Sequence, residues 1–302
     1  MSPRSSAPPP SPRVIAQEFV ETSGFPLEVR ATDAFRQAGF TSLSSLVYDN
    51  PATGDVGEID NFAFREASIP GEDPGASFQI SYVVECKRSA DVPWLLFRSQ
   101  PGGVLATPFL RSVTLLQSRG VGSLLFAHAG DWKDRLRLTA EMPGVAYRVR
   151  AARTGEDVAF KAVSGAVRAA RAQVESTSRQ HEAAKRERTR LPFEISRPVV
   201  VVSAPLFFCD FEPSGQFTLE ETERGSVLTT STAPTLPRSV LVDVVTEAGL
   251  ASYAAEQNLI ASELLDALNA PLRRAADLAA REYELRDQRD AASSISVDRP
   301  RS

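Results

Sequence analysis

Residues 76–88 read ASFQISYVVECKR, and this stretch is the clearest strand in the sequence. The even positions from Phe78 to Cys86 are all apolar, whereas the odd positions include Glu85 and Lys87. Successive side chains point to opposite faces of a β-strand. The alternation therefore predicts a strand with one buried face and one face that carries polar groups.

The segments before this strand predict a helix and two more strands. FPLEVRATDAFRQAGF, residues 25–40, has apolar residues at helical spacing and a glycine near its end. Residues 41–49 and 54–65 are strand-like, and the turn-rich pieces NPATGD and PGEDPG separate the strands. Such short connections favour an antiparallel meander.

The segments after the meander predict a helical crossover. Residues 156–190 form a long helix with an apolar stripe at spacings of three and four residues, consisting of Phe160, Val163, Val167, Ala170 and Val174. RPVVVVSAPLFFCDFE, residues 197–212, is a continuous apolar run, typical of a strand buried on both faces and parallel to its neighbour. The fold class expected is α/β with a mixed sheet.

The chain divides into four predicted parts: a disordered arm (1–13), a main domain (14–246), a helical extension (247–290) interrupted at Pro271, and a disordered tail (291–302). Within the main domain we expect an insertion around 93–150 with a helix near 106–118, a hairpin near 215–222 and a strand at 239–245.

Composition excludes several classes of protein. Hydrophobic residues make up 42% and charged residues 24%, no run approaches the roughly 18 apolar residues of a membrane span, and the N-terminus lacks an apolar signal region. A soluble, cytoplasmic protein is expected. Cys86 and Cys209 are the two cysteines, and His128 and His181 the two histidines. This supply excludes a structural zinc site and most nucleophiles activated by histidine.

Charge is unevenly distributed along the chain. The formal net charge is -4, yet residues 131–190 hold fourteen Lys/Arg against eight Asp/Glu. This surplus fits either a basic face that meets nucleic acid or the solvated side of a long helix.

Chemically informative residues lie on two predicted strands. GEID ends at Asp60, and ECK spans Glu85 to Lys87. Glu85 and Lys87 share one strand face, and strand pairing can bring Asp60 beside them. Two carboxylates ~4 Å apart at an effective dielectric of ~20 repel by about 4 kcal/mol, a penalty that a divalent cation would remove. Mg²⁺ suits oxygen ligands such as Asp60, Glu85 and the backbone carbonyl of Cys86.

GEID followed by VVECKRS closing a hydrophobic strand resembles the PD-(D/E)XK superfamily, in its restriction-endonuclease-like members. The resemblance covers residues from about 25 to 92 and from 156 to 210, and it implies a core of a helix, three strands, a helix and a strand. By this resemblance Asp60 is the first motif acid, Glu85 the second and Lys87 the motif lysine. Ile59 stands where the motif proline is usual, and residues 92–143 have no assignable counterpart.

The resemblance also implies that Glu28 is an additional acid that helps to bind metal through water. It implies an Mg²⁺-dependent endonuclease, with Mn²⁺ as a substitute, that hydrolyses DNA in bacterial defence or repair. A homodimer or a partner protein would help to select the target, since no DNA-reading motif is recognisable. Two alternatives are a ribonuclease and a catalytically silent nucleic-acid-binding or scaffold module with contacts near 179–190.

Simpler interpretations of the same residues stay open. Asp60 and Glu58 could be solvated on an exposed strand face, and Glu85 with Lys87 could form a surface ion pair worth ~1 kcal/mol or less. Glu28 could merely favour the positive end of its helix. Trp94 is expected in the core.

Overall fold

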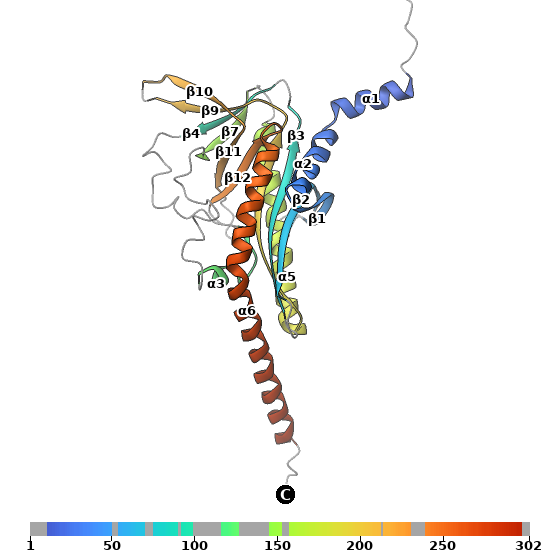
Figure 1. Cartoon of the computed structure of the whole chain (residues 1–302), viewed down its shortest axis with the longest axis vertical. Helices are drawn as coiled ribbons and strands as arrows, with labels where there is room; N and C mark the ends of the chain where they lie inside the picture. The colour runs from blue at the N-terminus through green and yellow to red at the C-terminus, as the bar shows by residue number, and fades with distance from the viewer. Residues whose placement is uncertain are drawn as a thin grey trace, which may run out of the picture.

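The computed structural model describes residues 11–49, 54–69, 75–89, 92–98, 116–126, 145–152, 157–212, 214–230 and 239–297. These residues form a mixed α/β structure with one large and one small β-sheet (Figure 1). The helices are α1 (Pro12–Thr22), α2 (Phe25–Gln37), α3 (Val121–Phe126), α5 (Val158–Glu187) and α6 (Leu250–Val297).

The large sheet has eight strands. Seven of them follow the order β1 (Thr41–Asp49), β2 (Val56–Ile69), β3 (Ala76–Lys87), β8 (Leu191–Val202), β12 (Ser239–Thr246), β11 (Arg224–Thr230) and β6 (Val145–Ala146), and β5 (Leu116–Gln117) pairs with β8. The β1–β2–β3 meander is antiparallel, whereas β3, β8 and β12 run parallel. The predicted mixed sheet of an α/β fold is therefore confirmed.

The small sheet has four strands in the order β10 (Phe217–Thr222), β9 (Leu206–Phe211), β4 (Trp94–Arg98) and β7 (Arg148–Ala151). The predicted single strand over residues 197–212 is wrong, because β8 ends at Val202 and β9 begins at Leu206. Between them, the carbonyl of Pro205 accepts a hydrogen bond from the backbone of Trp94, so the chain leaves one sheet and enters the other.

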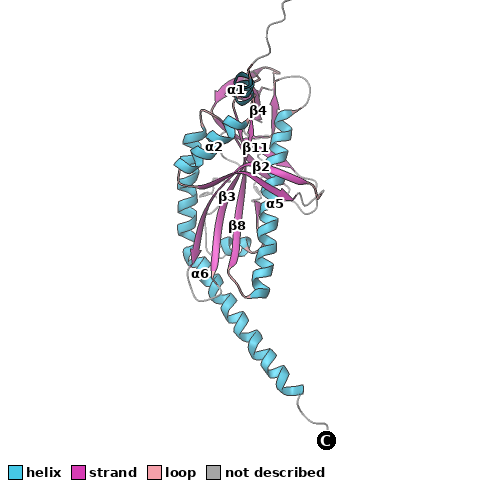
Figure 2. Cartoon of the chain, turned by 90° about the vertical axis from the view of Figure 1, so that its right-hand side faces the viewer, coloured by secondary structure: helices cyan, strands magenta, loops and turns pink. Residues whose placement is uncertain are grey.

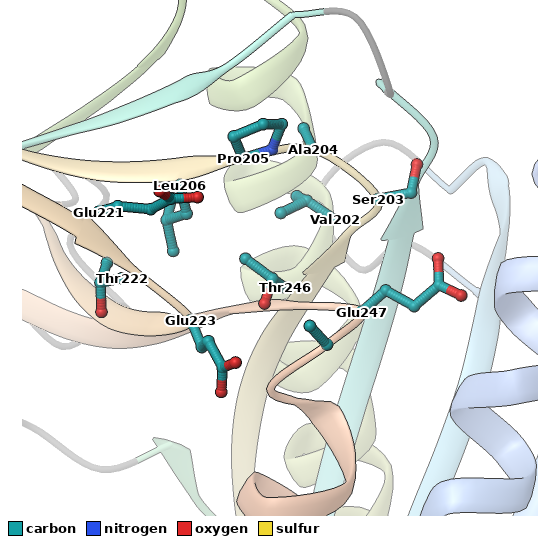
Figure 3. Close-up of a pocket in the computed structure, with 11 residues that line it drawn as sticks. Val202, Ser203, Ala204, Pro205, Leu206, Glu221, Thr222, Glu223, Thr246 and Glu247 are labelled. Carbon is teal, nitrogen blue, oxygen red and sulfur yellow. The ribbon is translucent and has the colours of Figure 1, made fainter.

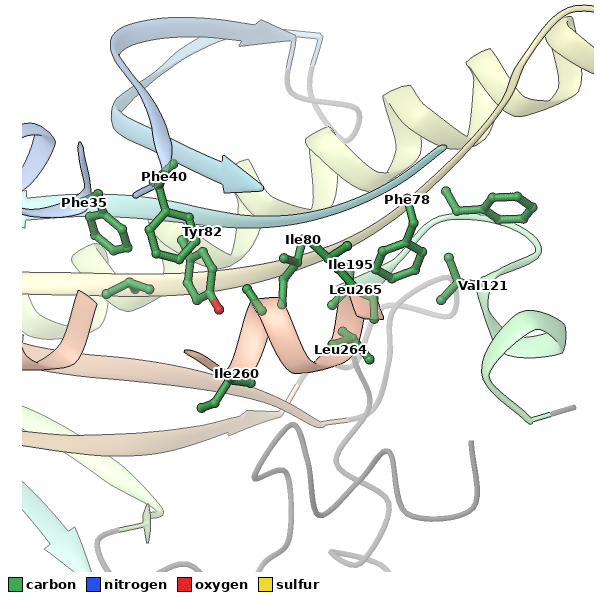
Figure 4. Packing of buried hydrophobic residues seen from close by; sticks show 14 of the residues in the cluster. Phe35, Phe40, Phe78, Ile80, Tyr82, Val121, Ile195, Ile260, Leu264 and Leu265 are labelled. Carbon is green, nitrogen blue, oxygen red and sulfur yellow. The ribbon is translucent and has the colours of Figure 1, made fainter. Parts of the chain in front are cut away.

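Helices cover both faces of the large sheet. In Figure 2, α5 lies on one side of β3 and β8, and α2 and α6 lie on the other. Figure 4 shows the second side, where Ile260, Leu264 and Leu265 of α6 pack with Ile80 and Tyr82 of β3. Both faces of the central strands are thus removed from water.

Alanines bring α5 close to the sheet. Val163, Ala170 and Val174 of the predicted stripe are buried, whereas Phe160 is 60% exposed. The buried face also includes Ala162, Ala166 and Ala169, at most 3% exposed. Small side chains permit a close approach of helix and sheet, so the helix backbone comes near whatever the strands present.

A buried carboxylate anchors α5 beneath its middle. Glu194 of β8 is fully buried and accepts hydrogen bonds from Ser81 Oγ (2.6 Å), Gln79 Nε2 (3.1 Å) and the hydroxyl of Thr177 on α5. Burial raises the pKa of Glu194 above its ordinary value. The polar face predicted for β3 is therefore covered by α5 along this part and not exposed to solvent.

A second buried network ties α6 to the sheet. The Arg197 guanidinium on β8 lies 2.8 Å from Asp243 Oδ2 of β12 and donates to Gln257 Oε1 of α6 at 2.7 Å. Asp243 also accepts hydrogen bonds from Tyr253 Oη (2.8 Å) and Ser226 Oγ (2.7 Å). Both charged groups are under 10% exposed and mutually compensated.

Other element boundaries differ from those predicted. α6 continues through Pro271, where an interruption was expected, and its later part extends past the sheet to Val297, inside the predicted disordered tail (Figures 1 and 2). α1 begins at Pro12, inside the predicted arm, with a Ser11 cap. The helix predicted near 106–118 lies mostly outside the described residues, and its end belongs to β5. No helix in the described part of the chain has a stretch apolar enough to cross a membrane.

Candidate active site

The site lies where β2 separates from β3. Backbone pairing between the two strands ends at Asn61 and Val84. Beyond this pair, a side chain takes the place of the backbone hydrogen bonds between the strands. Oδ2 of Asp60 accepts a hydrogen bond of 2.6 Å from the Cys86 backbone N–H. The side chain of Asp60 therefore reaches the backbone of the residue that separates Glu85 from Lys87.

A backbone irregularity accompanies this separation. The β1–β2 register pairs Ser44 with Asn61 and Leu46 with Ile59 but skips Ser45, which lies level with Asp60 and has a φ of 54°. The alternation of faces shifts here: Ile59 and Phe62, three residues apart, both pack in the cluster beneath α5. A regular strand would send them to opposite faces. The shift accounts for Asp60 turning toward β3.

Cys86 offers its carbonyl oxygen to the same gap. In an extended strand the N–H and C=O of one residue point to the same edge. Since the Cys86 N–H meets Asp60, its carbonyl faces β2 as well, whereas the Lys87 carbonyl faces β8 and accepts from Ser203 N–H at 3.1 Å. The sequence-derived assignment of the Cys86 carbonyl as a metal ligand is compatible with this orientation.

Glu85 and Lys87 form an ion pair beside the gap. Lys87 Nζ lies 2.6 Å from Glu85 Oε1, and the two side chains are 32% and 19% exposed, respectively. They are on the α5 side of β3, where a β-carbon at Gly165 of α5 would lie 3.6 Å from Glu85 Oε2. The pair is thus partly enclosed and still reachable from solvent.

Glu28 approaches from the first turn of α2. Its carboxylate is partly buried, and burial, followed by the charge of Glu58, raises its pKa. Lys87 and Glu85 also act on Glu28, so the helix and the strand end share one electrostatic field. Its neighbour Arg30 is paired with Glu247 at 2.5 Å.

The site holds more negative charge than it compensates. Burial, followed by the charge of Glu85, raises the pKa of Asp60 to about 7, despite the hydrogen bond from Cys86. Burial alone would lower the pKa of Lys87, but the hydrogen bond to Glu85 and the nearby carboxylates raise it overall. Burial and Asp60 raise the pKa of the Cys86 thiol well above its usual range, so Cys86 is no thiolate nucleophile.

This donor set fits a hard cation with few protein ligands. Within the described ranges, no three His, Cys, Asp or Glu side chains are grouped closely enough to hold a metal ion. Mg²⁺ requires only one or two carboxylates and keeps several waters. Asp60, Glu85 and the Cys86 carbonyl would suffice, with Glu28 acting through water.

An acidic cleft of about 710 Å³ adjoins the site on the side of β8 and β12 (Figure 3). Ser203, in its wall, is hydrogen-bonded to the Lys87 carbonyl and to the Ser89 N–H. The cleft is also lined by Glu221, Glu223 and Glu247. Glu247 is paired with Arg30, whereas the charges of Glu221 and Glu223 disfavour a phosphate backbone there.

The structure brings Asp60, Glu85, Cys86 and Lys87 together and couples Glu28 to them. Trp94 is fully buried, so its predicted place in the core is confirmed. Sequence reasoning missed Ser45 and Gly165. For Gly165 a signal existed, since glycine inside an alanine-rich helix suggests a close approach, whereas nothing in the sequence marks Ser45.

Comparisons with protein-family models, with curated proteins and with solved structures return no match to this chain. The function must therefore be inferred from the site itself.

Proposed function

We propose that the chain is a metal-dependent nuclease of the PD-(D/E)XK type, acting on phosphodiester bonds, with DNA as the favoured substrate. One observation carries the proposal: the Asp60 carboxylate bonds to the backbone between Glu85 and Lys87, at the point where two strands separate. The order α2, β1, β2, β3 and then, after the intervening elements β4 to β7, α5 and β8 supports it, because these six elements match the core order of the family that the sequence resembles.

Each residue has a chemical role in this proposal. Asp60, Glu85 and the Cys86 carbonyl would hold Mg²⁺, and Glu28 would bind through water. When bound, the metal would supply a Lewis acid for the phosphate oxygens and an activated water. The raised pKa of Asp60 supports this assignment, since a buried carboxylate with other carboxylates nearby gains most from a nearby cation.

Lys87 would orient the attacking water or stabilise charge that develops on the phosphate. Its ammonium already lies 2.6 Å from Glu85 Oε1, so it can exchange part of this contact for a phosphate oxygen or a water. Its raised pKa keeps it protonated at neutral pH, which suits electrostatic stabilisation and not a general base.

Substrate panels test the proposal. Purified protein is incubated with supercoiled plasmid, linear duplex DNA and structured RNA, with Mg²⁺, Mn²⁺ or EDTA. We expect DNA cleavage that requires metal, that is lost in Asp60→Ala and Lys87→Ala, and that persists in Asp33→Ala, a control on the exposed side of α2. Cleavage of RNA but not of DNA would indicate a ribonuclease.

Two outcomes would contradict the proposal. Cleavage that persists in both site variants would place the activity elsewhere, and binding of nucleic acid without any cleavage in either metal would favour the silent module. Circular dichroism of each variant separates lost chemistry from lost folding.

A further inference from the structure

α5 passes the candidate site at a glycine. A β-carbon at Gly165 would lie 3.6 Å from Oε2, 3.7 Å from Cδ and 3.8 Å from Oε1 of Glu85, so the helix surface at this point contacts the carboxylate directly. Ala162 and Ala166, buried on the sheet side, hold the helix at this short distance. Any group that binds at Glu85 must therefore meet the flank of α5 next to Gly165.

Two basic residues occupy that flank. Lys161 and Arg168 are four residues before and three residues after Gly165, and both are exposed. Residues at these spacings are neighbours on a helix surface, with β-carbons ~5–6 Å apart. Their charged ends can thus lie within roughly 10 Å of the Glu85 carboxylate, on the solvent side of the site.

The cleft that adjoins the site on the side of β8 and β12 is acidic. The cleft beyond Ser203 carries Glu221 and Glu223, which repel a polyanion, together with Glu247, whose charge is compensated by Arg30. A phosphate backbone that reaches Lys87 is therefore attracted along the α5 side and repelled on the cleft side. Contacts from exposed Lys and Arg side chains to phosphates fix the position and register of a protein on nucleic acid.

We propose that Arg168 and Lys161 form a phosphate clamp on α5, which binds the nucleic-acid backbone beside the scissile phosphate. The inference rests on the proposed function and specifies how the substrate strand is held. Arg168 donates a planar pair of N–H groups to one phosphate, and Lys161 supplies a point charge to an adjacent one. Both act in binding and leave the chemistry to Asp60, Glu85 and Lys87.

Binding isotherms test the clamp independently of cleavage. The full chain with Asp60→Asn, which removes the proposed cleavage, is titrated into a fluorescein-labelled DNA duplex at several salt concentrations. We expect Arg168→Ala to weaken binding roughly 10-fold and to reduce the slope of log K against log salt by about 1, and the Lys161→Ala, Arg168→Ala double variant to reduce it by about 2. Arg168→Lys should restore the slope but only part of the affinity.

The control is Arg186→Ala, an exposed arginine near the C-terminal end of the same helix. Unchanged affinity and slope in Arg168→Ala, or a loss of slope in Arg186→Ala in its place, would overturn the clamp. If the wild-type chain cleaves DNA and Arg168→Ala matches the control, only the clamp fails. If the slope depends on Arg168 but the wild-type chain never cleaves, only the nuclease proposal fails.

Discussion

The surroundings of Asp60 favour its protonated, neutral form unless a cation is close. Its carboxylate is partly buried and surrounded by Glu85 and Glu28, with one N–H and one ammonium as compensation. The pKa of about 7 in the folded protein exceeds the ordinary aspartate value of 3.8. The folded protein therefore binds a proton that the unfolded chain releases between these two pH values.

This shift fixes the sign of a pH dependence. Below pH ~4 Asp60 is protonated in both the folded and the unfolded state, so no charge has to be buried on folding and stability is highest with respect to this group. As pH rises from ~4 through 7 in EDTA, the free energy of unfolding should fall by roughly 1–3 kcal/mol, since one pKa unit is about 1.4 kcal/mol and partial exposure weakens the effect. Asp60→Asn should flatten this profile. Urea unfolding from pH 4 to 8 measures it.

Asp33→Asn serves as the comparison, because Asp33 is exposed on α2 with a side-chain exposure of 56%. It should keep the wild-type profile. An Asp60→Asn profile parallel to that of the wild type would show that Asp60 carries no excess charge penalty.

Among the single elements, β1 has an irregular backbone next to Asp60 of β2. Ser45 is an exposed residue of a strand, but its φ is 54°. β-branched residues scarcely adopt this left-handed backbone conformation. Strand propensity alone predicts that Ser45→Val is neutral or stabilising. The positive φ instead predicts that Ser45→Val lowers the free energy of unfolding by about 1–2 kcal/mol. Urea unfolding measures this change.

Ser44→Val is the matched control, since Ser44 is also exposed in β1 but has no positive φ. It should be close to neutral. Equal effects of the two substitutions would mean that the irregularity opposite Asp60 is absent or easily relaxed.

α5 provides a second element-scale prediction. Gly165→Ala adds a β-carbon at ordinary contact distance from Glu85, 3.6 Å from Oε2, so the helix should gain up to about 1 kcal/mol of stability. The same methyl group narrows the space around the carboxylate. We expect a higher melting temperature together with slower cleavage, whereas Ser164→Ala should leave cleavage unchanged. A less stable Gly165→Ala protein would contradict the spacing of helix and site.

The sequence predicts local elements well and their junctions poorly. The α2, β1, β2, β3 and α5 segments were predictable because each has a clear apolar period and turn residues at its ends. The break after Val202 was not, because apolar residues continue on both sides of it and tertiary pairing alone directs β9 to another sheet. Pro271 fails as a helix stop because Leu268 and Leu272, fully buried on either side, hold α6 against the core.

The candidate site shows the same division. The residue types at positions 60, 85 and 87 and their strand context predicted a shared location. The contact of Asp60 with the Cys86 N–H, the distortion at Ser45 and the approach of Gly165 depend on partners distant in sequence. Periodicity carries no information about such partners.

For the whole molecule, the buried Arg197–Asp243 pair joins the parallel strands to α6. Arg197→Met leaves the Asp243 carboxylate buried without its cation and should cost about 3–5 kcal/mol, measured by urea unfolding. The double variant Arg197→Met, Asp243→Leu removes both charges and should recover part of the loss. A single variant as stable as the wild type would show that water reaches this network.

The most direct test of the central claim is a single-turnover cleavage rate with Mg²⁺, measured on the best substrate for the wild type and for Asp60→Asn, Glu85→Gln and Lys87→Met. Asp33→Asn and Lys185→Met, both at exposed positions, are the controls. We expect each site variant to be slower by at least about 100-fold while remaining folded, and both controls to match the wild type. Site variants that cleave within a few-fold of the wild-type rate would contradict the central claim.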